Sequence, residues 1–322
     1  MISAELQEKI DRSIKRAQMF CHDPAGYFLA FSGGKDSIVC KQLLIEAGVP
    51  FSAFYRVTSV DPPELVQFIK QNHPDVKREI PTDEDGRPIT MWNLIPKKKT
   101  PPTRIVRYCC AALKESAGDG RLTVTGVRWE ESTNRKLNQG VATVVPSGKK
   151  TRSELLDSGN FAETRKRGVV LVNDNDEARL MLENCVTRHK VSVNIIIDWT
   201  DADVWNFIRD RGLPYCSLYD EGFRRIGCIG CPMARREERI RELTRWPKFR
   251  DAYLRAFQRM IDARKAAGMA PLRLFGLEEG RTATPRDVMR WWITPEISLR
   301  QETLTGTGAI DAGLDEADEM FY

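Results

Sequence analysis

The segment FSGGKDS at residues 31–37 places two glycines, two hydroxyls, an ammonium group and a carboxylate directly after the apolar run 27–30. Two glycines allow close approach of the backbone to a ligand and let several N–H groups point into one concavity, which suits phosphate. Ser32, Ser37 and Lys35 add donors for phosphate oxygens. An ordinary tight turn is the alternative, and the spacing is not that of a Walker A loop, which has four residues between its glycines. We predict a phosphate-binding loop.

A second charged segment, TGVRWEESTNR at residues 125–135, follows a predicted strand. Arg128 and Arg135 flank Glu131 and Ser132 there. The forked donors of a guanidinium group match the oxygens of phosphate and sulfate. A solvated charged turn would have the same composition. This segment therefore indicates an anion-binding site only in combination with the other motifs.

The chain contains eight cysteines, and we expect them to serve metal or redox chemistry, because disulfides are rare in cytosolic proteins. Cys109 and Cys110 are adjacent, and Cys228 and Cys231 form a CxxC motif. The other four are separated in sequence: Cys21, Cys40, Cys185 and Cys216.

Strand-like and helix-like segments alternate over the first two hundred or so residues, a pattern typical of a parallel α/β sheet. The loop at residues 31–37 then lies at the carboxyl end of a strand, where open α/β folds bind ligands. The predicted strands are 27–31, 51–57, 122–127 and 191–197. The predicted helices are 35–47, one opening at 61–63, 109–117, 200–211, and a pair within 234–267 broken near Trp246-Pro247.

The sequence divides into three parts. Residues 1–235 form a predicted nucleotide-binding α/β domain, with a polar inserted loop at about 136–180. Residues 236–300 form a helical extension, and residues 301–322 an acidic tail with six acids and no Lys or Arg.

The formal net charge of +5 rises to +11 without the six acids of the tail. A basic body suits an anionic partner such as an adenine nucleotide or a nucleic acid. No run of about 18 apolar residues is present, and charge interrupts the first twenty residues. We expect a cytoplasmic protein with no membrane partner.

Taken together, these motifs resemble a known family. The order strand–SGGKDS–helix is similar to the pyrophosphate loop of the adenine nucleotide α-hydrolase-like proteins. Segment 125–135, the YCC of 108–110 and LPYCSLYDEGFRRIGCIGCP at 213–232 resemble the phosphoadenylylsulfate reductase family over roughly residues 25–235.

The resemblance implies a parallel sheet with helices on both faces and a set of nucleotide-binding residues. Lys35, Asp36 and Arg128 would be catalytic, with Asp36 holding Mg²⁺ beside ATP. The nucleotide-binding residues would be Ser32, Gly33, Gly34, Lys35, Asp36, Ser37, Gly126, Arg128, Ser132 and Arg135.

The same resemblance implies that the cysteine motifs are cluster ligands. Cys109, Cys110, Cys228 and Cys231 look like the four thiolates of the [4Fe–4S] cluster in adenylylsulfate reductases. Zinc is the alternative metal. Cys216 is an alternative ligand in place of Cys110.

Two features depart from the reductases. No cysteine follows Cys231, so the usual nucleophilic thiol is missing, and the loop at 31–37 is intact, which suits ATP. Both favour the ATP pyrophosphatase members, such as the iron–sulfur protein of DNA phosphorothioation.

We therefore expect ATP-dependent adenylyl transfer linked to sulfur transfer or sulfonucleotide metabolism. The further partners considered are nucleic acid and a sulfur-carrier protein. One alternative is a sulfonucleotide reductase that uses a thiol from a partner. The other is a non-catalytic, nucleotide-bound iron–sulfur regulatory protein.

Overall fold

The chain is described by a computed structural model over residues 2–21, 24–115, 121–145, 149–164, 168–172, 190–270, 272 and 282–294. It divides into two units. The sheet unit comprises Met1–Arg56, Pro63–Glu79 and Ser116–Ile226. The helical unit comprises Val57–Pro62, Ile80–Glu115 and Gly227–Tyr322. The chain therefore passes between the units several times, and neither is a continuous stretch of sequence.

The sheet unit is built on one eight-stranded sheet with the order β3-β2-β1-β4-β8-β5-β7-β6. The first five strands in this order are parallel and the last three are antiparallel. The predicted α/β class, with a mostly parallel sheet flanked by helices, is confirmed. The parallel strands are β1 (Tyr27–Ala30), β2 (Phe51–Arg56), β3 (Lys77–Glu79), β4 (Thr123–Val124) and β8 (Lys190–Val193).

The polar segment at about 136–180, expected as an inserted loop, contributes the antiparallel part of this sheet. Its described elements are α6 (Thr133–Asn138), β5 (Ala142–Val145), α7 (Lys149–Asp157), β6 (Phe161–Glu163) and β7 (Val169–Leu171). Strand β5 pairs with β8 from Ala142↔Val193 to Val145↔Lys190, so main-chain hydrogen bonds extend the sheet. Strands of three or four residues are too short to show a period in sequence. Residues 173–189, which include Cys185, lie outside the described residues.

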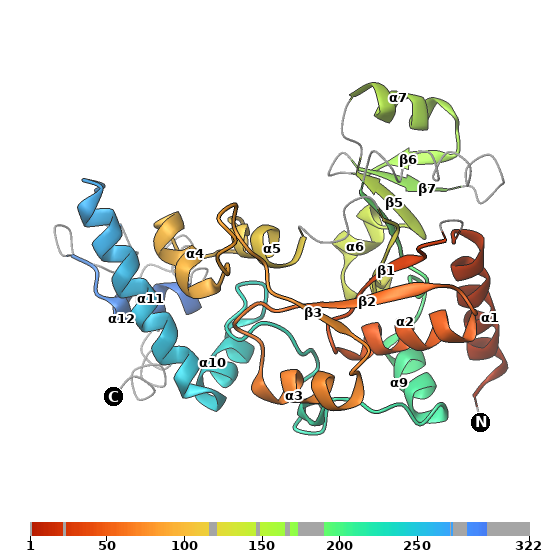
Figure 1. Cartoon of the computed structure of the whole chain (residues 1–322), viewed down its shortest axis with the longest axis horizontal. Coiled ribbons are helices and arrows are strands. Elements are labelled where there is room, and N and C mark those ends of the chain that lie inside the picture. The colour runs from red at the N-terminus through yellow and green to blue at the C-terminus, as the bar shows by residue number, and fades with distance from the viewer. Residues whose placement is uncertain are drawn as a thin grey trace, which may run out of the picture. The chain divides into compact units, whose positions relative to one another are not determined.

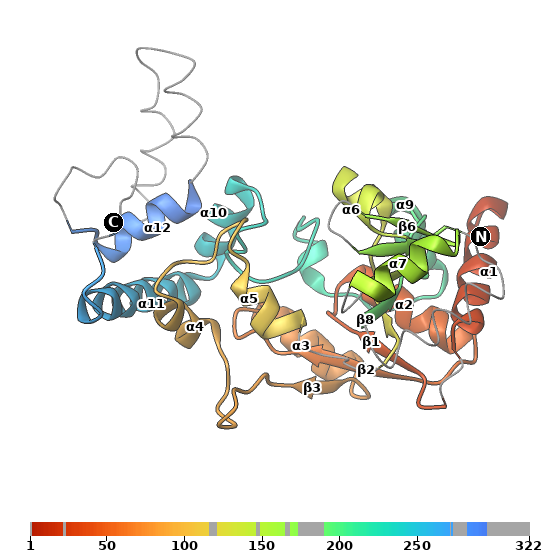
Figure 2. The same ribbon diagram turned by 90° about the horizontal axis from the view of Figure 1, so that it is seen from above.

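Helices flank the parallel strands. Helix α2 (Lys35–Glu46) packs on both α1 (Ala4–Met19) and α9 (Asp201–Asp210) beside them (Figures 1 and 2). Helix α3 (Pro63–Asn72) contacts the 3₁₀ turn η3 (Ser217–Tyr219). The helices expected at 35–47, from 61–63 and at 200–211 are confirmed to within a few residues.

The core of the sheet unit is apolar, as the buried runs in the sequence predict. Side chains of strands and helices meet there with at most 1% of their surface exposed, for example Leu29, Leu43, Val193, Trp199 and Phe207. This packing fixes the ends of β1, β4 and β8, and hence the loops that follow them.

The helical unit is formed by α4 (Met91–Lys98), α5 (Tyr108–Cys110), the π-helical turn η1 (Ala111–Glu115), α10 (Arg236–Arg245), α11 (Pro247–Ala266) and α12 (Pro285–Ile293). Helix α11 packs on α4 and α12. Tyr253, Phe257 and Trp292 form an aromatic core with ring centroids 4.8–6.1 Å apart. The break predicted near Trp246-Pro247 is confirmed, since α10 ends at Arg245 and α11 begins at Pro247.

The acidic tail 301–322 and the last residues of the predicted extension, 295–300, lie outside the described residues. Every helix in the described part of the chain is too short or too polar to cross a membrane.

Candidate functional site

The loop predicted to bind phosphate connects β1 to α2. Gly33 has φ 73°, a conformation that favours glycine. A Cβ added there would lie 2.7 Å from the side chain of Ile69 in α3. Gly33 is therefore required both by backbone conformation and by the close approach of α3.

Backbone N–H groups of this loop donate to hydroxyl oxygens. The Ser32 amide donates to Ser37 Oγ (3.2 Å), the Gly34 amide to Ser32 Oγ (3.3 Å) and the Lys35 amide to the Tyr219 hydroxyl (3.0 Å). In the part of the chain that the structure describes, the amides of Gly33 and Asp36 make no such bond. The Ser32 and Gly34 amides thus face neutral serine oxygens, which negatively charged phosphate oxygens can replace.

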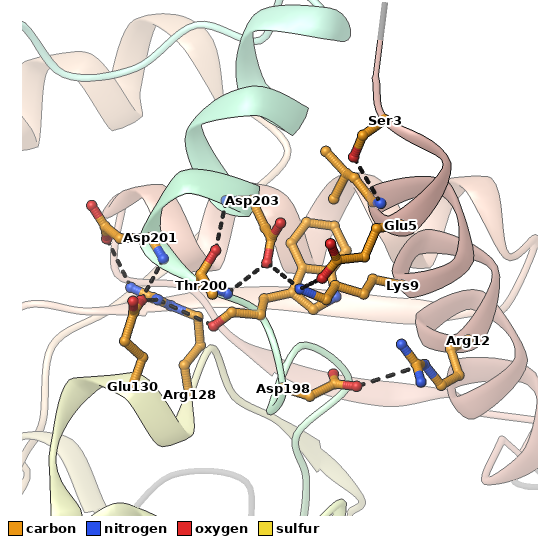
Figure 3. Close-up of polar contacts among 12 residues, drawn as sticks. Ser3, Glu5, Lys9, Arg12, Arg128, Glu130, Asp198, Thr200, Asp201 and Asp203 are labelled. Carbon is orange, nitrogen blue, oxygen red and sulfur yellow. Dashed lines mark hydrogen bonds and ion pairs between the residues drawn. The ribbon is translucent and has the colours of Figure 1, made fainter.

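Arg128 is the centre of an ion-pair network beside the loop. Its guanidinium group is 3% exposed and donates to Asp36 Oδ1 (2.7 Å), Glu130 Oε2 (3.0 Å) and Asp201 Oδ1 (3.0 Å). It also donates to the Trp199 carbonyl at 3.3 Å. Figure 3 shows Arg128 between Glu130 and Asp201. All three of its nitrogens are thus bound to acceptors of the protein itself.

The pKa of Arg128 agrees with its binding to these carboxylates. Burial by itself would lower the pKa of Arg128, but the charges of Asp36 and Asp201 and its hydrogen bonds outweigh burial and raise it. The guanidinium joins the first turn of α2, which carries Asp36, to the first turn of α9, which carries Asp201. In the structure Arg128 orients these carboxylates. Its predicted catalytic role and its predicted contact with the nucleotide remain predictions.

Lys35 lies in the same network. Its buried ammonium group is 3.1 Å from Asp201 Oδ1 and 3.4 Å from Asp36 Oδ2. With Arg128, two positive charges face three carboxylates, those of Asp36, Glu130 and Asp201. The local charge is therefore negative, and a polyphosphate needs an additional cation to bind here.

The donor set fits Mg²⁺ in kind, because Mg²⁺ is held by one or two carboxylates together with phosphate oxygens and waters. Within the described ranges, no three His, Cys, Asp or Glu side chains are close enough to hold a metal ion alone. The carboxylates therefore suit an ion that arrives with its nucleotide.

Gly126 permits this arrangement through close packing. A Cβ at this position would lie 2.8 Å from Asp36 Cβ and 3.1 Å from its backbone carbon. Any side chain here would push Asp36 away from Arg128. Gly126 thus packs closely against Asp36 in the structure. Its predicted role in nucleotide binding remains a prediction.

Ser132 and Arg135 make local contacts. The Ser132 hydroxyl accepts from the Arg135 amide at 3.2 Å and caps α6. Arg135 forms an ion pair with Glu131, four residues earlier. Their predicted role toward the nucleotide remains a prediction.

Three residues of the site were not identified from sequence: Glu130, Asp201 and Tyr219. Asp201 follows β8 by a short turn and so lies at the same sheet edge as the loop, a signal that the strand order could have given. Tyr219 carries no charge, and only the three-dimensional arrangement places its hydroxyl on the loop.

The paired cysteine motifs are brought together in the helical unit. Cys109 and Cys110 lie on α5, while Cys228 and Cys231 precede α10. The hydrogen bond between Cys109 and Cys110, followed by burial, raises the pKa of Cys109, and the charges of Cys228 and Cys231 add to this rise. The other three thiols are therefore within electrostatic range of Cys109. As they stand in the described part of the chain, no three of these thiols are close enough to hold a metal ion.

Positive charge surrounds these thiols. The hydrogen bond to Cys109 lowers the pKa of Cys110, as do the neighbouring Arg107 and Lys114. The charge of Cys228 raises the pKa of Lys114. Cys228 also contacts the Thr58 hydroxyl at 3.6 Å. Four thiols with two nearby cations match an anionic iron–sulfur cluster in the kind and number of ligands, but in the described residues their spacing is not that of a formed metal site.

Cys216, the predicted alternative ligand, belongs to the sheet unit. It is 1% exposed and immediately precedes η3. Burial raises the pKa of this thiol.

A mostly parallel sheet with a glycine-rich loop at the carboxyl end of β1 defines an α/β protein of the kind that seats phosphate groups. The profile of the phosphoadenosine phosphosulfate reductase domain matches residues 26–234. The chain belongs to this family.

Curated relatives match shorter or more distant stretches. The uncharacterized protein MJ0973 of Methanocaldococcus jannaschii is 34% identical over 80 residues, covering 25% of this chain and 18% of that protein. Adenosine 5'-phosphosulfate reductase of Staphylococcus epidermidis is 46% identical over 41 residues, covering 13% and 17%. The uncharacterized protein MJ0066 of M. jannaschii is 24% identical over 232 residues, covering 68% and 39%. The chain thus spans less than half the length of these relatives.

Solved structures resemble the chain weakly. Phosphoadenylyl-sulfate reductase from Candida auris has a TM-score of 0.38 at 12% identity, covering 71% of this chain and 96% of that one. FMN adenylyltransferase from Candida glabrata, in complex with FMN and an ATP analogue, has a TM-score of 0.38 at 12% identity, covering 71% and 67%.

Proposed function

We propose that this protein is an ATP-dependent adenylyl-transferring enzyme that releases pyrophosphate and acts in sulfur transfer or sulfonucleotide metabolism. The observation that carries the proposal is the loop of residues 31–37. It presents backbone amides and Lys35 at the start of α2, beside three carboxylates whose excess negative charge suits Mg²⁺. Membership of the family supports a nucleotide substrate.

Donor groups and carboxylates have different proposed roles. The amides of Gly33 and Gly34, with Ser32, Ser37 and Lys35, bind the β- and γ-phosphates and stabilise the pyrophosphate as it leaves. Asp36 binds the Mg²⁺ that accompanies ATP. Arg128 and Gly126 hold Asp36 in place, so the carboxylate needs little rearrangement when the ion arrives.

The four cysteines of the helical unit are proposed as ligands of a [4Fe–4S] cluster, with zinc as the alternative metal. When bound, the cluster supplies redox and sulfur chemistry. Cys109, Cys110, Cys228 and Cys231 would hold it, while Lys114 and Arg107 offset its negative charge. Cys216 stays the alternative to Cys110. A nucleic acid or a sulfur-carrier protein is the proposed sulfur partner.

A sulfonucleotide reductase is the second candidate, favoured by the matches to adenosine 5'-phosphosulfate reductases. Since no cysteine follows Cys231 in the sequence, this reaction would use the thiol of a partner protein. An iron–sulfur regulatory protein that binds nucleotide without turnover is the remaining alternative.

The test is pyrophosphate release from ATP and Mg²⁺ by anaerobically purified protein, in the presence of candidate acceptors. We expect Lys35→Ala to abolish release, because the ammonium group that faces the leaving phosphates is gone. Lys70→Ala is the control, since Lys70 is an exposed lysine of α3 in the same unit. Release unchanged in Lys35→Ala would refute the role of the loop.

The alternatives give different products. Sulfite released from adenylylsulfate, with an added thiol protein and without pyrophosphate release from ATP, would identify the reductase. Bound nucleotide and iron with neither turnover would identify the regulatory protein.

A further inference from the structure

Tyr219 lies on the phosphate loop, although it is 184 residues away in sequence from Lys35. Its hydroxyl accepts a hydrogen bond from the Lys35 amide at 3.0 Å, and the Lys35 ammonium group is 5.9 Å from the centroid of its ring. A Cβ added to Gly34 would lie 3.4 Å from the same hydroxyl. Tyr219 therefore packs against the loop at Gly34, where the absence of a side chain leaves room for its hydroxyl.

The hydroxyl of Tyr219 differs from the two serine hydroxyls of the loop in what its hydrogen does. Ser37 donates to the Gly34 carbonyl at 2.8 Å, and Ser32 bonds to Ser37 Oγ at 3.3 Å. Tyr219 accepts from Lys35, and within the described residues its own hydrogen has no acceptor. Of the three hydroxyls, that of Tyr219 is the one left with a hydrogen to give.

The ring of Tyr219 is fixed in position. Trp205 of α9 meets it edge-on, with centroids 5.0 Å apart and planes at 86°. Tyr215 packs on the same Trp205 at 5.2 Å. A donor on a held ring loses little conformational freedom when it binds, and its bond from the Lys35 amide strengthens it as a donor.

We propose that Tyr219 is a phosphate-binding residue of this site, whose hydroxyl donates to an oxygen of the polyphosphate end of ATP while it accepts from the Lys35 amide. This inference rests on the proposed function, because it assumes that the loop binds ATP. Burial keeps the hydrogen on the oxygen, since it raises the pKa of Tyr219. The alternative is that the phenol of Tyr219 occupies the place of a phosphate oxygen. ATP would then have to displace the phenol in order to bind.

The experiment compares Tyr219→Phe with wild type in equilibrium binding of Mg²⁺–ATP, inorganic pyrophosphate and AMP. A hydrogen bond to a charged group predicts a loss of about tenfold or more in affinity for ATP and pyrophosphate. The affinity for AMP, which lacks the β- and γ-phosphates, should be unchanged. Tyr215→Phe is the matched control, because the Tyr215 hydroxyl bonds Asp220 at 3.1 Å and not the loop.

Each outcome decides the matter. Unchanged affinities in Tyr219→Phe would overturn the inference, and tighter binding would show that the phenol blocks the loop. An equal loss for AMP would assign Tyr219 to general packing, and a lowered melting temperature would accompany it. Failure of wild type to bind ATP or pyrophosphate would instead refute the proposed function.

Discussion

Arg128 shows how one side chain can organise the carboxylates of a site. The guanidinium group binds three carboxylates from three segments, and each of these carboxylates lies at the sheet edge where β1, β4 and β8 end. Because Asp36 and Asp201 also contact Lys35, removal of Arg128 would leave one ammonium group among three acids.

This arrangement predicts that Arg128→Met is strongly destabilising. Carboxylates that lose a buried partner keep the cost of their partial burial, so we expect a loss of about 2 kcal/mol or more in the free energy of unfolding. Urea denaturation monitored by fluorescence measures it. Arg135→Met provides the control, since its more exposed pair with Glu131 should cost less than about 1 kcal/mol. Equal losses in the two variants would contradict the central role of Arg128.

At the residue scale, the sequence predicted which residues gather but not what each one touches. Glycine spacing and the strand before it identified the loop, and charge identified Arg128. The sequence could not show that Arg128 is saturated by acids, because Asp36 and Asp201 lie 92 and 73 residues from it along the chain. Long-range contacts of this kind depend on strand order, which no local pattern encodes.

Helix α9 is the element that joins the site to the rest of the sheet unit. Thr200 and Asp203 form a capping box, and Asp203 also binds Lys9 of α1 at 2.8 Å. Figure 3 shows Asp203 between Thr200 and Lys9. Since Asp201 and Trp205 are on the same helix, this cap also sets the positions of the carboxylate and the ring that act at the loop.

The cap predicts a pH-dependent contribution to stability. Burial by itself would raise the pKa of Asp203, but hydrogen bonds from Lys9 and Thr200 outweigh it, so the pKa is lowered. A carboxylate with a lowered pKa in the folded state stabilises above the unfolded value of about 4. This contribution is lost as the pH falls through the folded value.

We therefore expect Asp203→Asn to lower the free energy of unfolding by about 1 kcal/mol near pH 7. The difference from wild type should shrink below about pH 4. Denaturation at a series of pH values measures it, with Glu8→Gln, a change at an exposed acid of α1, as control. A difference independent of pH would show that the ion pair with Lys9 contributes nothing.

Elements with strong local signals were predicted well, and short ones were not. The glycine-rich loop, the capping box of α9 and Trp246-Pro247 each mark a helix boundary through the conformation of one or two residues. Strands β5, β6 and β7 have three or four residues and exist because β8 offers a free edge to pair with. These strands are determined by pairing with other strands of the sheet, and the sequence of the segment alone does not encode that pairing.

At the scale of the whole molecule, the proposed ATP-binding residues and the proposed cluster ligands belong to different units. All groups proposed to bind ATP belong to the sheet unit, whereas all four paired cysteines belong to the helical unit. The chain passes between the units after Arg56, Pro62, Glu79, Glu115 and Ile226, so neither unit can be produced by simple truncation. Point variants that remove one bound ligand at a time are therefore the way to study the two proposed sites separately.

This division predicts that loss of iron leaves ATP binding intact. In Cys228→Ser one thiolate ligand is missing, so we expect little or no iron per chain after anaerobic purification. Mg²⁺–ATP should still slow hydrogen exchange in residues 32–37 and at Tyr219, because their contacts lie within the sheet unit. Cys21→Ser, outside the paired motifs, should keep wild-type iron and the same protection. If Cys228→Ser lost iron and nucleotide protection together, the two sites would depend on each other, and the assignment of one chemistry to each unit would fail.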